Sequence, residues 1–331
     1  MKTLVTGATG FIGRHLVRRL VKEGRSVTCL VRETSDVKFL EELGVELVYG
    51  DLLVKDSLKH TVENEAIDTV YHIAGAVYAW RSKQFHQVNV RGTKNLLDSC
   101  SHCGLKKFVY LSSIAVNSLS KKGNLISETY PCNPFTPYGK SKLNAENLII
   151  NFFADTDISA TIIRTPVVYG PDGQSDLLTR HFKSILQGRA YMIGDGVNLR
   201  SLCYIDNLIY GLLLAEKGTP SKRTIYVVAD DRVYSFKEIA NTTADVYNIA
   251  LDTVHLPSLI ASIAYCMLHL FNFVGLYSWR LYSLATMNLD LGCDTSHAKE
   301  KLGYHPRITL REGIKKTVQW CKKEGLLRSL F

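Results

Sequence analysis

Short apolar runs rich in β-branched residues alternate, through the first half of the chain, with segments whose apolar residues recur at helical spacing. The runs read TLVTG, SVTCLVR, VELVYG, DTVYHIAG, KFVYLSS and ATIIRTPVVYG. Strands that are almost continuously apolar and are separated by helices are typical of a parallel sheet covered on both faces. The pattern therefore predicts the α/β class, with a Rossmann-type, doubly wound parallel sheet.

The sequence pattern changes near residue 166, where turn-rich segments such as GPDGQSD, IGDGVNLRS and EKGTPSKR begin. We expect residues 1–165 to form a dinucleotide-binding Rossmann domain, to which a later segment, about 200–230, returns. Residues 166–331 are expected to form mainly a smaller substrate-binding lobe. Such a lobe would close a cleft at the carboxyl edge of the sheet.

One apolar segment, 256–277, contains no Asp, Glu, Lys or Arg and is long enough to span a bilayer. Pro257, His269, Asn272 and Gly275 interrupt it. Three interpretations stay open: a buried or pocket-lining helix pair, which we favour, peripheral membrane contact, and a membrane span.

Composition narrows the class of protein. The chain has 331 residues, 46% hydrophobic and 21% charged, as in soluble globular proteins, and a formal net charge of +9. Its Lys-Lys pairs are scattered and no nucleic-acid motif occurs, so we expect a small-molecule substrate and no nucleic-acid partner. The eight cysteines lie far apart and the N-terminus enters a strand directly, which predicts reduced thiols, no signal peptide and a cytoplasmic location, with or without membrane association. Cys100 and Cys103 have zinc-like spacing but lack a second pair, so we expect no metal site.

A glycine-rich turn, TGATGFIG, follows the first predicted strand and opens a helix. Gly7 suits a tight turn, Gly10 a close approach of the backbone to a pyrophosphate, and Gly13 close packing of helix on strand. The phosphates would meet unpaired amides at the helix N-terminus. We therefore predict a dinucleotide site that also includes Thr9, Phe11 and Ile12.

The choice of dinucleotide depends on the end of the second predicted strand. Val31 and Arg32 stand where a carboxylate would bind the ribose 2′-hydroxyl. Arg32 could pair with a 2′-phosphate, so we expect NADP, with NAD as the alternative. Asp51, just after the third strand, could accept a hydrogen bond from the adenine amino group, or it could cap a helix.

Tyr138 and Lys142 lie four residues apart in YGKSKLNAENLII, so they share one face of the predicted helix. An ammonium near a phenol lowers the phenol's pKa toward neutrality, as an acid/base acting on an alcohol or ketone requires. Ser112 and Ser113 end a buried strand at the ligand-binding edge of the sheet, where a serine can hydrogen-bond the reacting oxygen.

Together these motifs resemble the extended short-chain dehydrogenase/reductase family, also called the NAD(P)-dependent epimerase/dehydratase family. The resemblance covers nearly the whole chain and rests on TGATGFIG, DLL, HIAG, NVRGT, LSS, YGKSK and RTPVVYGP. It implies that Ser113, Tyr138 and Lys142 are catalytic and that Ser113 also contacts substrate. It further implies cofactor contacts from Leu52, Ala74, Gly75, Asn89, Tyr138, Lys142, Pro166 and Val167. Relatives are often dimers, so we expect a homodimer formed through helices near 83–100 and 140–153.

The substrate hypotheses depend on where this sequence matches, or differs from, the residue patterns of particular members of the family. Ile114 and Ala115 after Ser113 disfavour a sugar dehydratase, which would need an acidic pair there. Arg200 resembles the arginine that binds the diphosphate of nucleotide sugars, unless it forms a structural salt bridge. Val167, where such enzymes carry asparagine, counts against binding of a uridine-diphosphate sugar, and the uncharged segment 256–277 favours an apolar substrate instead.

Two enzyme hypotheses therefore stay open. We expect hydride transfer at C4 of a nucleotide sugar. The alternative is an NADP-dependent reductase of an apolar ketone, of the 3β-hydroxysteroid dehydrogenase or dihydroflavonol reductase kind. A third hypothesis, a non-catalytic dinucleotide sensor, is disfavoured because Ser113, Tyr138 and Lys142 are all present.

Overall fold

The computed structural model describes residues 1–62, 66–100, 104–117, 119–120, 122–173, 176–218 and 223–326. The main sheet of the protein has seven strands in the order β11-β6-β5-β4-β1-β2-β3, and every neighbouring pair is parallel. The strands are β1 (Lys2–Thr6), β2 (Ser26–Val31), β3 (Glu46–Tyr49), β4 (Thr69–His72), β5 (Lys107–Ser113), β6 (Ser159–Thr165) and β11 (Arg223–Val227). This order confirms the predicted Rossmann-type sheet.

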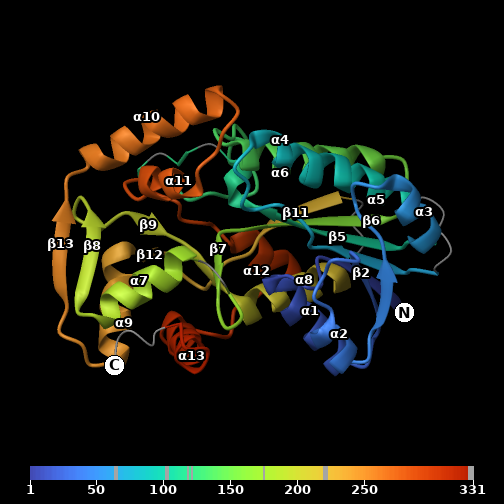
Figure 1. Cartoon of the computed structure of the whole chain (residues 1–331), viewed down its shortest axis with the longest axis horizontal. Helices are drawn as coiled ribbons and strands as arrows, with labels where there is room; N and C mark the ends of the chain where they lie inside the picture. The colour runs from blue at the N-terminus through green and yellow to red at the C-terminus, as the bar shows by residue number, and fades with distance from the viewer. Residues whose placement is uncertain are drawn as a thin grey trace.

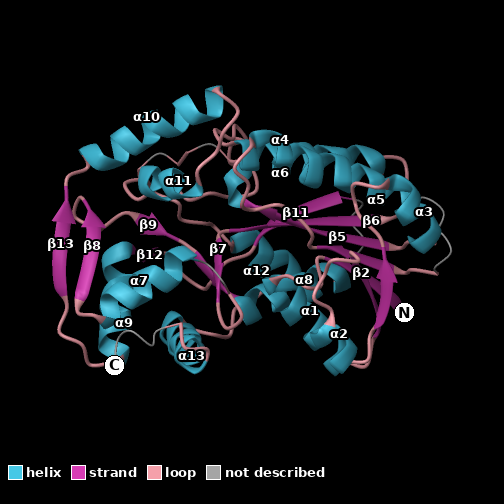
Figure 2. Cartoon of the chain, in the orientation of Figure 1, coloured by secondary structure: helices cyan, strands magenta, loops and turns pink. Residues whose placement is uncertain are grey.

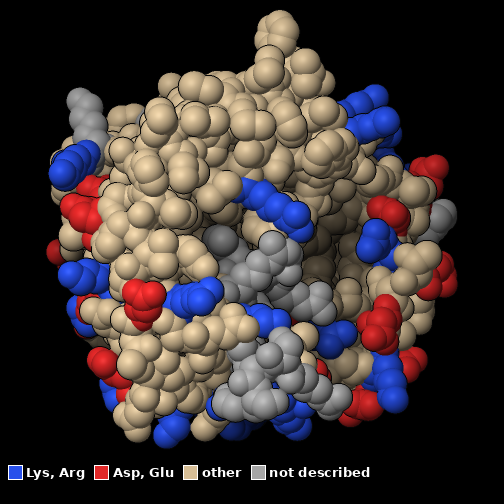
Figure 3. Space-filling model, turned by 60° about the vertical axis from the view of Figure 1, so that its left-hand side comes forward, with Lys and Arg blue, Asp and Glu red and all other residues tan. Residues whose placement is uncertain are grey.

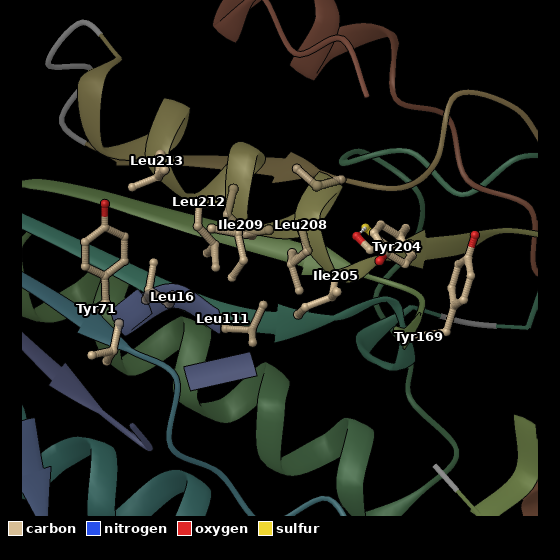
Figure 4. Close-up of a cluster of buried hydrophobic side chains, with 14 of the residues drawn as sticks. Leu16, Tyr71, Leu111, Tyr169, Tyr204, Ile205, Leu208, Ile209, Leu212 and Leu213 are labelled. Atoms are coloured by element: carbon tan, nitrogen blue, oxygen red, sulfur yellow. Dashed lines mark hydrogen bonds between the residues drawn. The ribbon is translucent and has the colours of Figure 1, made fainter. Parts of the chain in front are cut away.

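Helices cover both faces of this sheet (Figures 1 and 2). One face carries α1 (Phe11–Lys22), α2 (Lys38–Glu42) and α8 (Ile205–Lys217). The other carries α3 (Lys55–Val62), α5 (Gly92–Cys100) and α6 (Pro137–Phe152). Leu208 and Leu212 of α8 and Leu16 of α1 belong to one core cluster, which Figure 4 shows in part. The apolar stripes of the helices are thus buried against the sheet, as the helical spacing requires.

The second lobe is built from three two-stranded sheets and their helices. Its strands are β7 (Val167–Tyr169), β8 (Arg189–Ile193), β9 (Leu199–Arg200), β10 (Leu202–Tyr204), β12 (Tyr234–Ser235) and β13 (Asp252–Leu256). Its helices are α7 (Asp176–Leu186), α9 (Phe236–Val246), α10 (Leu259–Phe273) and α11 (Trp279–Thr286); α12 (Ser296–Leu302) and α13 (Leu310–Lys323) follow. A small separate core of Ile185, Ala190, Met192, Ala240 and Ala244 holds part of this lobe together.

Two expectations about individual elements were wrong in part. The run ATIIRTPVVYG is not one strand: β6 stays in the main sheet, whereas β7 pairs with β10. The break falls at Pro166, which has no N–H to donate to a ladder. In the segment 256–277, Leu256 ends β13, Leu259–Phe273 forms α10, and a turn follows before α11. The described chain contains no helix long and apolar enough to cross a membrane.

The switch point of the sheet lies between β1 and β4, where the strand order reverses. The glycine turn leaves the end of β1 and the segment Ile73–Ala76 leaves the end of β4. Parallel sheets of this kind bind ligands in the crevice at this point. The fold therefore brings the predicted cofactor residues of both loops to one edge.

Candidate active site

The glycine turn is packed too tightly for side chains at two of its positions. A Cβ on Gly13 would lie 2.0 Å from the Gly7 carbonyl oxygen, and one on Gly7 would lie 2.7 Å from the Ala74 amide nitrogen. Gly7 also has a positive φ of 73°, a conformation that L side chains rarely adopt. Gly10 is the N-cap of α1 and brings no side chain to the first helical amides. These amides and the surrounding cradle fit the pyrophosphate of a dinucleotide.

At the adenosine end, Arg32 lies exposed directly after β2, and its amide donates to Ser35 Oγ at 3.2 Å. Asp51 follows β3, and its Oδ1 accepts from the Leu53 amide at 2.8 Å. The Leu52 carbonyl accepts a hydrogen bond of 2.8 Å from Asn95, which ties this loop to α5. Asp51 therefore closes a turn within its own loop, and it is not the cap of α3, which begins at Lys55.

The three predicted catalytic residues lie together. Ser113 ends β5, and its Oγ accepts from the Ala115 amide at 3.1 Å. Tyr138 lies in the first turn of α6, which begins at Pro137 after the N-cap Thr136. Burial raises the pKa of Tyr138 to about 12, and a hydrogen bond with Ser113 lowers it in part. The phenol is therefore protonated and hydrogen-bonded with Ser113.

Lys142 lies one turn further along α6 and is buried. Its ammonium donates to the Leu111 carbonyl at 2.7 Å and lies 4.6 Å from the centroid of the Tyr110 ring. Burial lowers its pKa to about 8, with Glu146 raising it in part. The expected net shift of the Tyr138 pKa toward neutrality was wrong for this structure, because burial of the phenol outweighs the effect of the ammonium.

The segment after β4 passes between Asn89 and Lys142. A Cβ on Gly75 would lie 3.2 Å both from Asn89 Oδ1 and from Lys142 Nζ. Asn89 lies in a π-helical turn, His86–Arg91, where its side chain accepts from the Ala76 amide at 2.7 Å and donates to Ser141 Oγ at 2.9 Å. π-Helical turns often occur at functional sites. Asn89 thus fixes the loop that contains Ala74 and Gly75.

A buried ion pair supports the catalytic helix, and the sequence pattern did not reveal it. Glu146 lies one turn after Lys142 and binds the Arg164 guanidinium through contacts of 2.7 and 3.1 Å. Ser112 also donates to Glu146 Oε1. Two signals were available: a charged residue within the apolar run TIIRT, and a glutamate four residues after Lys142 on the same helical face. The pair joins α6 to the ends of β5 and β6.

Arg200 is a half-buried cation that forms no ion pair among the described residues. Its guanidinium donates to the Thr286 carbonyl and lies 4.8 Å from the centroid of the Phe236 ring. Its Nε has no hydrogen-bond partner among the described residues. Burial lowers the pKa of Arg200 to about 10. The nearby Asp290 raises this pKa in part, and the role of Arg200 stays a prediction.

A small pocket lies next to the end of β5 that carries the predicted catalytic serine. It lies beside Ile114 and Ala115, which follow Ser113, and Tyr282 of α11 closes it on the side of Arg200. Burial of the Tyr282 phenol raises its pKa, which the nearby Arg200 lowers in part. The sequence did not mark Tyr282, because an aromatic residue at helical spacing is typical of a core. The lining residues are Ile114, Ala115, Asn117, Leu119, Phe135, Thr136, Tyr282 and Leu291.

The last predicted cofactor residues lie at the junction of β6 and β7. Pro166 is buried, whereas Val167 is 46% exposed. The described residues contain no cluster of His, Cys, Asp and Glu that could hold a metal ion. Cys100 is buried and Cys103 lies outside the described residues, so the interpretation of this pair stays a prediction.

The fold and this site define a dinucleotide-dependent enzyme, and comparison with known proteins gives its family. Residues 3–229 match the model of the NAD dependent epimerase/dehydratase family, and the chain belongs to that family. Its members are NAD-dependent oxidoreductases and epimerases, which confirms the predicted resemblance and sets the sensor hypothesis aside.

Relatives of similar length act on different substrates. N-acetyl-α-D-glucosaminyl-diphospho-ditrans,octacis-undecaprenol 4-epimerase of Escherichia coli O157:H7 is 24% identical over 96% of this chain and 94% of its own. The 2-alkyl-3-oxoalkanoate reductase of Stenotrophomonas maltophilia is 28% identical over 96% and 98%. The solved structure of UDP-glucuronic acid 4-epimerase from Bacillus cereus in complex with NAD has a TM-score of 0.77 at 25% identity, over 98% of this chain and 97% of that one.

Proposed function

We propose that this enzyme transfers hydride at a secondary alcohol or ketone, at C4 of a sugar that is linked through a diphosphate. Nucleotide sugars belong to this class, and so does a sugar on a lipid diphosphate, the substrate named for the E. coli relative. The observation that carries the proposal is Arg200, whose half-buried guanidinium has no carboxylate at ion-pair distance among the described residues, and whose charge Asp290 offsets only in part. A buried charge without compensation is costly, and a diphosphate suits the planar guanidinium.

The residues of the glycine turn, Gly7 to Gly13, are proposed to hold the pyrophosphate of the dinucleotide. Leu52, Ala74, Gly75, Asn89, Pro166 and Val167 are proposed to contact the rest of the cofactor. Arg32, with Val31 and not an acid before it, supports NADP over NAD, because a guanidinium pairs with a 2′-phosphate. The dinucleotide would supply the donor or acceptor of hydride for the carbon that bears the oxygen.

Ser113 and Tyr138 handle the oxygen and its proton. Tyr138, with its pKa held near 12, is protonated at neutral pH and donates its proton to the oxygen of a ketone as the alcohol forms. Ser113 hydrogen-bonds the same oxygen and stabilises the charge that develops there. Lys142, fixed on the Leu111 carbonyl, places its ammonium one helical turn from the phenol and favours the phenolate that results.

One observation favours the apolar-ketone alternative. Tyr138 packs in a cluster with Phe85, Tyr277, Phe135 and Tyr282, and its ring centroid lies 5.9 Å from that of Phe85. Aromatic walls of this kind suit an apolar ligand. The reductase from S. maltophilia shows that such chemistry occurs among the relatives.

The experiment that separates the two functions uses Arg200. NMR would follow conversion of each candidate substrate by the protein. The diphosphate sugars are UDP-glucose and UDP-N-acetylglucosamine, each with NADP or NAD. The ketone is a long-chain 3-oxoalkanoate, with reduced cofactor. We expect turnover of a diphosphate sugar, and a KM roughly 10- to 100-fold higher for Arg200→Met. Arg311→Met, an exposed arginine on α13, is the matched control. Turnover of the ketone alone, or an unchanged KM in Arg200→Met, would overturn the diphosphate assignment.

The homodimer and the cytoplasmic location are also proposals. The first rests on the family resemblance and the second on the cysteine content of the sequence. Sedimentation equilibrium of the purified chain tests the dimer, since a monomer over the working concentration range would rule it out.

A further inference from the structure

The outer side of α10 exposes large apolar side chains along its whole length. They recur every three to four residues, the spacing of one helical face, and their exposed fractions range from 44% to 88%. We call this surface the α10 outer face; it consists of Leu259, Ile263, Met267, Leu270, Phe273 and the adjoining Val274. Residues 253–279 contain no Asp, Glu, Lys or Arg. A surface helix of a soluble protein normally directs charged residues to this side.

The inner side of α10 packs against the rest of the protein. Ala261, Ala264 and Leu268 are buried, and the rings of Tyr265 and His269 lie 5.8 and 6.4 Å from that of Phe135. The helix therefore cannot turn its outer face inward without losing these contacts. Phe135 also lines the pocket beside Ile114 and Ala115, so α10 packs against one wall of this pocket.

Residue types typical of a membrane interface surround the C-terminal end of α10. Trp80 is 60% exposed, and its ring centroid lies 6.2 Å from that of Phe271. The Ser82 amide donates to the Gly275 carbonyl at 2.9 Å, which places the exposed side chains of Arg81 and Lys83 beside this end. Tryptophan prefers the headgroup level of a bilayer, and basic side chains attract anionic lipid.

Figure 3 shows the end of the molecule that carries α10. Its upper surface is almost free of Lys, Arg, Asp and Glu, and charged side chains gather below it. Basic groups at the margin of an apolar face, on a chain with net charge +9, complement an anionic surface.

We propose that the α10 outer face docks on the surface of an anionic phospholipid membrane, with Trp80 at headgroup level and Arg81 and Lys83 against lipid phosphates. The helix lies in the interface and does not cross it, in agreement with its length. Docking brings the pocket beside Ser113 close to the bilayer, from which a lipid-linked substrate would reach it. The membrane contact itself does not depend on which substrate is turned over.

The test is co-sedimentation of the full chain with vesicles of phosphatidylglycerol and phosphatidylethanolamine, and with vesicles of phosphatidylcholine alone. We expect the wild type to sediment with the anionic vesicles. Leu270→Asp and Phe273→Asp should each weaken binding about tenfold or more, because each removes a large apolar side chain from the interface. Leu326→Asp, a 45% exposed leucine after α13, is the control and should bind like the wild type. Arg81→Gln together with Lys83→Gln should remove the preference for anionic vesicles.

Thermal unfolding and cofactor binding of each variant establish that the fold is intact. Two results overturn the proposal. One is failure of the folded wild type to bind anionic vesicles. The other is a wild type that is dimeric without lipid and becomes monomeric in Phe273→Asp, which would show that a second copy covers the α10 outer face.

Discussion

Gly13 packs against Gly7 so closely that no side chain fits between the helix and the turn that precedes it: a Cβ on Gly13 would lie 2.0 Å from the Gly7 carbonyl oxygen. Alanine is normally the better residue within a helix, by about 1 kcal/mol. Here the clash is with backbone, which cannot rotate away. The contact fixes the position of the amides at the start of α1.

We therefore expect Gly13→Ala to destabilise the protein by about 1–3 kcal/mol or more, as overpacking does, and to weaken cofactor binding. Thermal unfolding and cofactor titration measure the two effects. Gly44→Ala is the control, since Gly44 has a positive φ and open space around it, and should cost about 1 kcal/mol. An unchanged melting temperature in Gly13→Ala would contradict the packing described.

Breaking the Glu146–Arg164 ion pair should strongly lower the free energy of unfolding. Both side chains are buried, so Glu146→Gln leaves the Arg164 guanidinium without its counter-charge. Breaking such a pair on one side costs about 3–5 kcal/mol. Arg19→Gln, which breaks the surface pair between Arg19 and Glu23, should cost no more than about 0.5 kcal/mol. Urea denaturation of both variants compares them, and equal losses would be inconsistent with the burial of the Glu146 pair.

Lys142 should make stability depend on pH in the alkaline range. Its pKa is about 8 in the folded protein and 10.5 for the ordinary side chain. Between these values the unfolded chain binds a proton that the folded chain has released, so this contribution to the free energy of unfolding rises with pH. Below about pH 8 the buried ammonium is a cost. The difference in stability between wild type and Lys142→Met should therefore change across this range, and a constant difference would refute the lowered pKa.

Arg32 should govern the choice of cofactor. Arg32→Glu removes the guanidinium proposed to bind the 2′-phosphate and adds a like charge. We expect the KM for NADP to rise roughly 10- to 100-fold, the value of a charge-assisted hydrogen bond, and the KM for NAD to stay the same or fall. Steady-state kinetics with both cofactors give the ratio. If the two KM values change equally, Arg32 does not contact the 2′-phosphate.

The sheet and the glycine turn could be predicted because local patterns encode them. Apolar runs of β-branched residues became β1 to β6, and Gly7, Gly10 and Gly13 open α1 as the spacing indicated. Pro166, in contrast, ends β6 and sends β7 to another sheet, and a proline alone does not say which partner the next strand takes.

The environment of the site residues could not be predicted in the same way. Arg200 lies half-buried beside Phe236 and Thr286 through contacts between distant segments, and a single sequence gives no signal for them. The pKa of Tyr138 depends on desolvation by side chains from several elements, so the Tyr-Lys spacing gave the wrong direction. The α10 outer face also differs from the favoured interpretation, because periodicity indicates a helix but not which of its two apolar sides is covered.

The replacement Tyr138→Phe tests the central claim most directly. It removes only the phenolic oxygen that is hydrogen-bonded with Ser113, so folding and cofactor binding should be retained. Turnover of a substrate of the wild-type enzyme, measured with saturating cofactor, should fall roughly 10²- to 10⁴-fold, the contribution of a general acid/base. Near-normal turnover in a correctly folded Tyr138→Phe protein would contradict the proposed chemistry.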